Sequence, residues 1–201
     1  LALGLASSLI ATALAVPAAL AVARFRFPGR DAISAFLLSP LMIPHIVLGV
    51  AFLRFFSAIG INGTFGGLVM AHVIVVLPFA LRLVLASATG MDPAVERAAV
   101  SLGAGRFTVF RRITLPLILP GIVSGWLLAF ITSFDELTMS VFIASPSTTT
   151  LPVRMFLHIQ DTIDPLVAAV SALMIAGTVL LMGALDRLVG LERLFVGKGK
   201  H

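Results

Sequence analysis

Long stretches without a charged residue constrain this chain more than any other feature of its sequence. Six such stretches occur, at 1–23, 32–53, 55–81, 113–134, 137–153 and 165–185. About 20 apolar residues in a helix match the roughly 30 Å hydrocarbon core of a bilayer, so five of the six are predicted to cross a membrane. The exception is 137–153, where serines, threonines and two prolines interrupt any apolar helix. A re-entrant or extramembrane loop is expected there.

The composition agrees with a membrane protein. Hydrophobic residues make up 59% of the chain and charged residues only 11%, where a soluble domain carries roughly a quarter charged. The absence of cysteine excludes disulfides, thiolate metal sites and a cysteine nucleophile. The glycine-rich turn signal at 60–67 divides the longest stretch, which predicts a third span from about Phe65 to Ala86.

The cations lie mostly on one predicted side of the membrane. Arg54 and Arg154 fall on the other side, and Arg82 can reach the cation-rich face from the end of the third span. The cations of the rich side are Arg24, Arg26, Arg30, Arg97, Arg106, Arg111, Arg112, Arg187, Arg193, Lys198 and Lys200. Because lysine and arginine mark the cytoplasmic side, the C-terminus is expected to be cytoplasmic. Spans interrupt this basic set, so no nucleic-acid partner is expected.

Two further features concern the ends of the chain and the packing of the spans. With five spans the two ends lie on opposite sides, yet Leu1 opens directly into an apolar helix, so we expect an N-terminally truncated piece that lacks one earlier span. Small residues spaced four apart are predicted to let helices approach closely. They are Ala11, Ala15, Ala19 and Ala23, then Gly121 and Gly125, and finally Ala168, Ala172 and Ala176.

The segment 92–112, between the third and fourth spans, is the most distinctive part of the chain. Asp92 is a good N-cap, Pro93 suits the first helical position, Glu96 favours the positive helix end, and Gly103 suits a left-handed helix end. The segment therefore predicts a short helix, a glycine hinge and a basic helix returning to the membrane. An apolar side formed by Ala98, Ala99, Leu102 and Phe107 fits either lipid headgroups or a groove on a partner.

This segment resembles the EAA loop of the membrane subunits of bacterial ABC importers. Ala98 and Ala99 are followed after three residues by Gly103, and nine residues later come Ile113, Leu115 and Pro116. Arg97 occupies the position of the motif's glutamate, with Glu96 displaced by one, and Glu96 is the candidate to substitute for it. The stretches 24–30, 133–136 and 150–153 are similar to the spermidine/putrescine branch of these permeases.

The resemblance implies an all-α, polytopic transmembrane bundle of the type I ABC importer permease kind, with five of the family's six spans in a single domain, 1–201. It also implies that the protein lies in the bacterial inner membrane and that 92–112 is its coupling loop on the cytoplasmic side. The expected partners are an ATPase subunit, a second, different permease subunit, an extracytoplasmic solute-binding protein and membrane lipid. The coupling residues are expected to be Glu96, Arg97, Ala98, Ala99, Gly103, Ile113, Leu115 and Pro116.

No enzymatic activity is expected of the chain itself. A phosphate-binding GxxxxGK[ST] motif does not occur, the nearest match being Gly197-Lys198 followed by Gly199, so ATP hydrolysis is assigned to a separate subunit. No cofactor is expected. His45, His72 and His158 are isolated in sequence, which predicts no metal site.

Asp135 and Glu136 end the fourth span on the outer side and are candidates for the solute path. Two carboxylates at a helix C-terminus oppose the helix dipole. They either cap a short following helix and face water, or they attract a cationic solute. The resemblance to the spermidine/putrescine branch implies a polyamine as the cargo, and such a cation would be attracted by this pair. Another solute of such importers, whether a metal ion, an oxyanion, thiamine or a sugar, is the alternative, and a secondary transporter is a more remote one.

Overall fold

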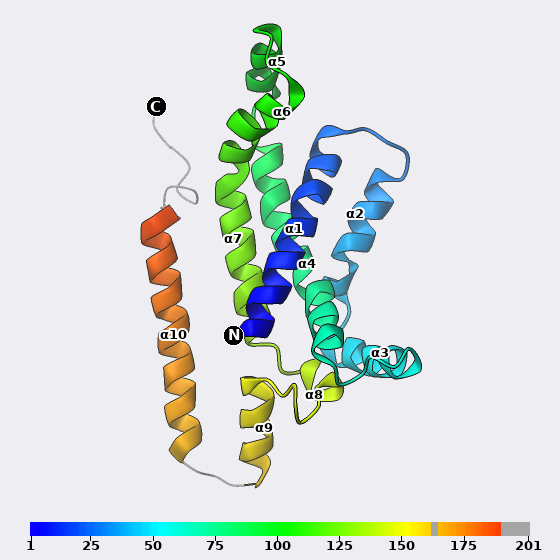
Figure 1. Ribbon diagram of the computed structural model, residues 1–201, viewed down its shortest axis with the longest axis vertical. Helices are drawn as coiled ribbons and strands as arrows, with labels where there is room; N and C mark the ends of the chain where they lie inside the picture. The colour runs from blue at the N-terminus through cyan, green and yellow to red at the C-terminus, as the bar shows by residue number, and fades with distance from the viewer. Residues whose placement is uncertain (162–164, 190–201) are drawn as a thin grey trace.

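A computed structural model describes residues 1–161 and 165–189, and all the regular structure in these ranges is helical. The predicted all-α fold class is confirmed. The helices, shown in Figure 1, are α1 (Ala2–Arg24), α2 (Arg30–Leu38), η1 (Ser39–Met42), α3 (His45–Ala58), α4 (Phe65–Thr89), α5 (Pro93–Ser101), α6 (Arg106–Val109), η2 (Phe110–Thr114), α7 (Leu115–Phe134), α8 (Ser140–Ile143), α9 (Leu151–Asp161) and α10 (Pro165–Val189).

Helices α1, α4 and α7 pack against one another along their lengths and form the core. Ala11, Ala15 and Ala19 are completely buried, as their spacing predicts, while Ala23 is half-buried. Small side chains on this face of α1 let the backbone of α4 come close.

The glycine pair of α7 lies directly against α4. A Cβ added to Gly121 would stand 2.2 Å from the Ser87 hydroxyl oxygen and 2.7 Å from the Leu83 carbonyl oxygen. One added to Gly125 would stand 3.0 Å from the Ala80 carbonyl oxygen. The predicted close approach at this GxxxG pair is therefore confirmed.

The second predicted span is bent rather than continuous. The segments Arg30–Met42 and His45–Ala58 meet at an angle of 103°. Pro44 lacks an N–H group, and it holds the preceding Ile43 in an extended conformation with ψ 126°. The chain therefore turns at this point, and α3 runs across the end of the bundle (Figure 1).

The loops at this end match the sequence-based expectation. Gly60 and Gly63 have φ values of +75° and +72°, and α4 starts after them at Phe65. The stretch 137–153 contains only the four-residue α8 and the start of α9, so it does not span. Its Ser145 hydroxyl donates a hydrogen bond of 2.8 Å to the Gly63 carbonyl oxygen and so ties the two loops together.

Three helices in the described ranges are long and apolar enough to cross a membrane: α1, α4 and the continuous 106–134 segment. The bent pair would make a fourth. Helix α10 runs alongside the bundle (Figure 1), and its apolar part in the described ranges, Val167–Leu180, is shorter than a full span. Ala168, Ala172 and Ala176 of α10 are exposed, so the packing predicted for this stripe is not made within the described part of the chain.

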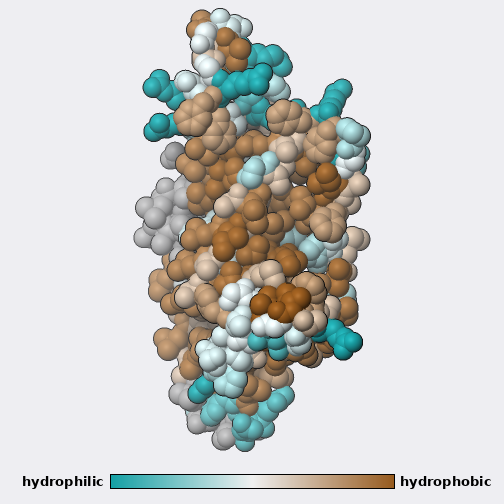
Figure 2. Space-filling model, turned by 45° about the vertical axis from the view of Figure 1, so that its right-hand side comes forward, coloured by the Kyte–Doolittle hydropathy of each residue, from teal (hydrophilic) through white to brown (hydrophobic). Residues whose placement is uncertain are grey.

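Apolar side chains form a broad band between two more hydrophilic ends (Figure 2). The arginines at the end of α1, after it and in α6 and η2 gather at the end that carries α5, while α3 and α9, with Arg54 and Arg154, lie toward the other (Figure 1). Three predicted cytoplasmic cations, Arg193, Lys198 and Lys200, lie outside the described residues.

Candidate functional site

The segment 92–112 folds into the short helix and hinge that its sequence predicts. The Asp92 carboxylate accepts a hydrogen bond of 2.8 Å from the Ala94 N–H, and Pro93 begins α5. At the other end Gly103 has φ +87°, and the Ala104 N–H donates to the Ala99 carbonyl oxygen at 3.0 Å. This left-handed closure satisfies the last carbonyl groups of the helix and turns the chain sharply.

Helix α5 projects from the end of the bundle, beyond α6 (Figure 1). None of its residues is buried, and its apolar Val95 and Val100 are exposed. Leu102, directly after the helix, is 88% exposed, and Phe107 in the following helix is 73% exposed. Ala98 is exposed and Ala99 half-buried. Hydrophilic side chains gather between this tip and the apolar body of the molecule (Figure 2).

Glu96 is held within the chain. One of its carboxylate oxygens pairs with the guanidinium of Arg24 at the end of α1, and the other accepts a hydrogen bond from the Thr114 hydroxyl in η2. A second guanidinium nitrogen of Arg24 lies 3.7 Å from the Met91 sulfur. The neighbouring Arg97 is exposed. The sequence pattern does not reveal this arrangement, because Arg24 and Glu96 are 72 residues apart.

The last three residues of the predicted coupling set lie where the chain re-enters the apolar band. Ile113 belongs to the wide π turn η2, and Leu115 and Pro116 begin α7. Pro116 has no N–H to donate to the carbonyl group four residues earlier, and its ring crowds that group, so the helix widens before it. In agreement, the Leu115 N–H donates to the Phe110 carbonyl oxygen, five residues back.

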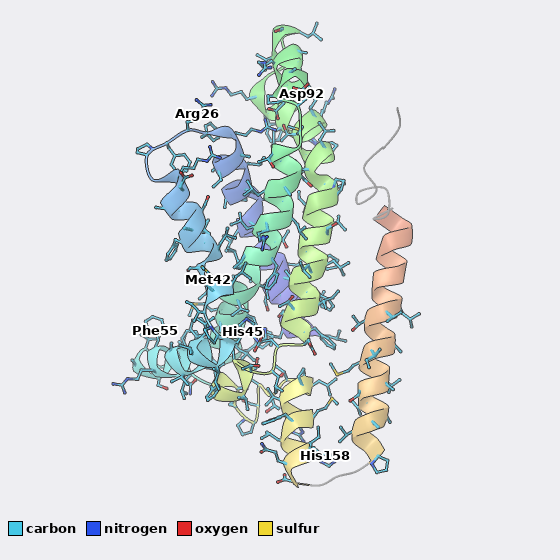
Figure 3. The ribbon with its side chains drawn as sticks, turned by 180° about the vertical axis from the view of Figure 1, so that it is seen from behind. Arg26, Met42, His45, Phe55, Asp92 and His158 are labelled. Atoms are coloured by element: carbon cyan, nitrogen blue, oxygen red, sulfur yellow. The ribbon has the colours of Figure 1, made fainter. Side chains whose placement is uncertain are left out.

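The two candidate solute-path carboxylates are in different environments. Asp135 follows the last residue of α7 and is exposed, whereas Glu136 is only 6% exposed. One oxygen of Glu136 accepts a hydrogen bond of 2.6 Å from the Met139 N–H, and the other lies 2.7 Å from Nδ1 of His45. His45 begins α3 just after the bend and points toward the bundle (Figure 3). Glu136 therefore joins α3 to the turn that follows α7.

A buried polar cluster lies next to this pair. His72 of α4 is fully buried, with Nδ1 2.8 Å from the Ser133 hydroxyl and Nε2 2.9 Å from the Ser140 hydroxyl. The Ser133 hydroxyl is 3.4 Å from that of Ser7. His45 and His72 are isolated in sequence but both have polar partners in the fold. A histidine in the middle of an apolar span was the available signal, because such a group is expected to find a partner.

Comparisons with known proteins agree with the geometry. Residues 12–190 match the family model described as "Binding-protein-dependent transport system inner membrane component". The chain is 37% identical over 183 residues to the spermidine/putrescine transport system permease protein PotC of Haemophilus influenzae, covering 91% of this chain and 68% of that one. It is 35% identical to the putrescine transport system permease protein PotI of Escherichia coli strain K12, covering 83% of this chain and 61% of the relative.

The fold also has a counterpart among solved structures. A chain of the MetNI methionine ABC transporter, in an inward-facing conformation, matches with a TM-score of 0.74 at 20% identity, covering 93% of this chain and 91% of that one. At this level of identity the match shows a shared fold. The overall arrangement of the helices is therefore one that a solved structure also has.

Proposed function

The chain belongs to the family of inner-membrane components of binding-protein-dependent transport systems, and we propose that it is a permease subunit of an ATP-driven importer. The observation that carries this proposal is the projecting helix α5 at the arginine-rich end of the bundle. Leu102 at the tip of this projection is apolar and exposed to solvent, which is typical of a surface that binds another molecule. A helix lying on lipid would place its apolar face at the level of the headgroups, but this tip stands beyond the hydrophilic side chains that border the apolar body (Figure 2). Binding in a groove on a separate ATPase subunit therefore explains the exposed apolar side chains at this tip better than binding to lipid does.

The proposed mechanism assigns the chemistry and the motion to different polypeptides. The family is one of transport permeases, and ATP is hydrolysed by the ATPase subunit. Closure of two ATPase subunits moves α5, and the contacts of Glu96 with Arg24 and Thr114 pass that motion to α1 and α7. A second, different permease completes the pore, and an extracytoplasmic binding protein delivers the solute. In this scheme α5 and the C-terminus are cytoplasmic.

Single cysteines test both the orientation and the docking. Because the chain has no cysteine, Leu102→Cys and Ser147→Cys each supply one exposed thiol, at opposite ends. An impermeant maleimide is expected to label Ser147→Cys in spheroplasts and Leu102→Cys only in inside-out vesicles. A cross-linker on Leu102→Cys, but not on Ser147→Cys, should capture a polypeptide that azido-ATP labels. The opposite labelling, or no nucleotide-labelled product, would contradict the proposal.

We propose that the solute is a polyamine and that Asp135 and Glu136 help to attract it. The proposal is supported by the negative charge of both residues at the outer end of α7 and by the similarity to PotC and PotI. The alternative is another solute carried by the same kind of permease.

Neutralising both carboxylates is expected to weaken polyamine uptake. The double variant Asp135→Asn/Glu136→Gln should raise the half-saturation concentration of spermidine uptake by about tenfold, since about 1.4 kcal/mol of lost attraction corresponds to that factor. Uptake of labelled spermidine by cells measures it. Asp161→Asn at the exposed end of α9 is the matched control and should change little. An equal effect of both substitutions would count against the role of the pair.

A further inference from the structure

The groove beside α5 has a cationic rim and a partly apolar lining. It has a volume of about 580 Å³ and is lined by residues of α5, α6 and η2, among them Arg97, Val100, Arg106, Val109 and Phe110. Arg97 and Arg106 are exposed, while Val109 is buried and Phe110 is 36% exposed. A side chain entering this groove would thus meet two guanidinium groups and an apolar floor.

The acidic residues of α5 do not neutralise this rim. The Asp92 carboxylate caps the start of the helix. Glu96 also lines the groove, but its two carboxylate oxygens are engaged by Arg24 and Thr114. In the described part of the chain no carboxylate forms an ion pair with Arg97 or Arg106. The free charge that this surface offers is therefore positive.

We propose that this groove receives a carboxylate-bearing segment of the ATPase subunit, with Arg97 and Arg106 as its ion-pair partners and Glu96 as an internal positioning residue. The inference rests on the proposed function and adds the chemistry of the contact. Arginine binds carboxylates through a planar fork of N–H donors, and complementary charge steers docking and fixes its register. Because Glu96 fixes α5 to the end of α1 and to η2, which leads into α7, the two arginines are presented at a set position relative to the spans.

Charge reversal at the rim is the direct test. The tagged subunit, extracted from its native membranes in mild detergent, is assayed for capture of the azido-ATP-labelled ATPase at low and high salt. Arg97→Glu and Arg106→Glu should each reduce capture by about tenfold or more, because like charges across an interface are costly. Arg97→Lys should retain most of it. High salt should weaken capture by the unmodified subunit.

Matched variants separate the alternatives. Arg26→Glu reverses an exposed charge at the same end of the molecule, outside the groove, and should leave capture unchanged. Equal capture by Arg97→Glu, Arg106→Glu and the unmodified subunit would overturn the inference while the proposed function stands. If Arg97→Glu and Arg106→Glu change only the amount of anionic lipid that co-purifies, and not the capture of the ATPase, the inference would be overturned in the same way. Failure of the unmodified subunit to capture any nucleotide-labelled protein would instead contradict the proposed function.

The positioning role of Glu96 has its own readout. Arg24→Glu would place a second carboxylate next to Glu96, and Glu96→Arg would place a second guanidinium next to Arg24. In both variants the like charges repel, so the ratio of uptake to ATP hydrolysis should fall. The exchange Arg24→Glu/Glu96→Arg restores the pair and should restore the ratio. If Glu96 instead contacts the ATPase directly, the exchange will leave the ratio low and overturn this role. Should the single reversals not accumulate, Glu96→Gln, which retains an acceptor for Arg24 and Thr114, is expected to keep capture intact, and loss of capture would overturn the role.

Discussion

Replacing Gly103 with valine is expected to leave the subunit in the membrane but to uncouple ATP hydrolysis from uptake. Gly103 has φ +87°, and a Cβ added there would meet nothing within 4 Å. The penalty therefore comes from the backbone, where a left-handed L residue costs roughly 1–2 kcal/mol and a β-branched one is rarer still. If the backbone at residue 103 changes to relieve this strain, α5 would turn away from the position in which it is proposed to contact the ATPase subunit. In proteoliposomes we expect uptake to fall by about tenfold or more while hydrolysis continues.

Two substitutions serve as controls for Gly103. Gly103→Asn should retain most uptake, because asparagine adopts the left-handed conformation at helix ends more readily than other residues. Gly105→Val, two residues away, should also be tolerated, since Gly105 has φ −67° and open space around its Cβ position. Normal uptake by Gly103→Val would show that the hinge does not set the position of α5.

The second large effect is expected at the contact between α4 and α7. Gly121→Val should strongly lower the amount and the thermal stability of the subunit, because even a single Cβ would overlap the Ser87 side chain and the Leu83 carbonyl oxygen. Overpacking of this kind typically costs about 1–3 kcal/mol, and valine adds more atoms than alanine. The apparent unfolding temperature in detergent, followed by tryptophan fluorescence of Trp126 or by aggregation, measures the loss.

The matched control lies in a helix with open space. Gly177 of α10 has no atom within 4 Å of an added Cβ, so Gly177→Val should change stability little. A partial rescue adds a sharper test. Ser87→Gly combined with Gly121→Ala removes the side-chain overlap but leaves the Leu83 carbonyl oxygen 2.7 Å away, so its stability should fall between those of Gly121→Ala and the unmodified subunit. Equal stability of Gly121→Val and Gly177→Val would contradict the close contact.

Features set by neighbouring residues could be predicted from the sequence. The bounds of α5 depend on Asp92, Pro93 and Gly103, which act within a few residues of themselves. The start of α4 at Phe65 follows from the glycine-rich turn before it. The stripe of alanines in α1 is buried because its spacing matches the helical repeat.

Features set by distant contacts could not be predicted in the same way. Glu136 and His45 are 91 residues apart and meet only because Pro44 turns α3 across the end of the bundle. A proline between two apolar stretches is compatible with a mild kink or a sharp turn, and packing decides between them. The ion pair between Glu96 and Arg24 similarly requires the end of α1 to lie close to α5, and no local sequence pattern predicts that contact.

The wide turn η2 fixes the angular phase between two surfaces of one chain segment. Successive residues of an α-helix are rotated by about 100° around its axis. A single π turn adds about one residue without breaking the backbone. Side chains before Phe110 are thus rotated relative to those of α7. The seam that carries Gly121 can therefore face inward while the arginines that precede the turn face another direction. The number of residues in this turn matters more for that arrangement than which residues they are.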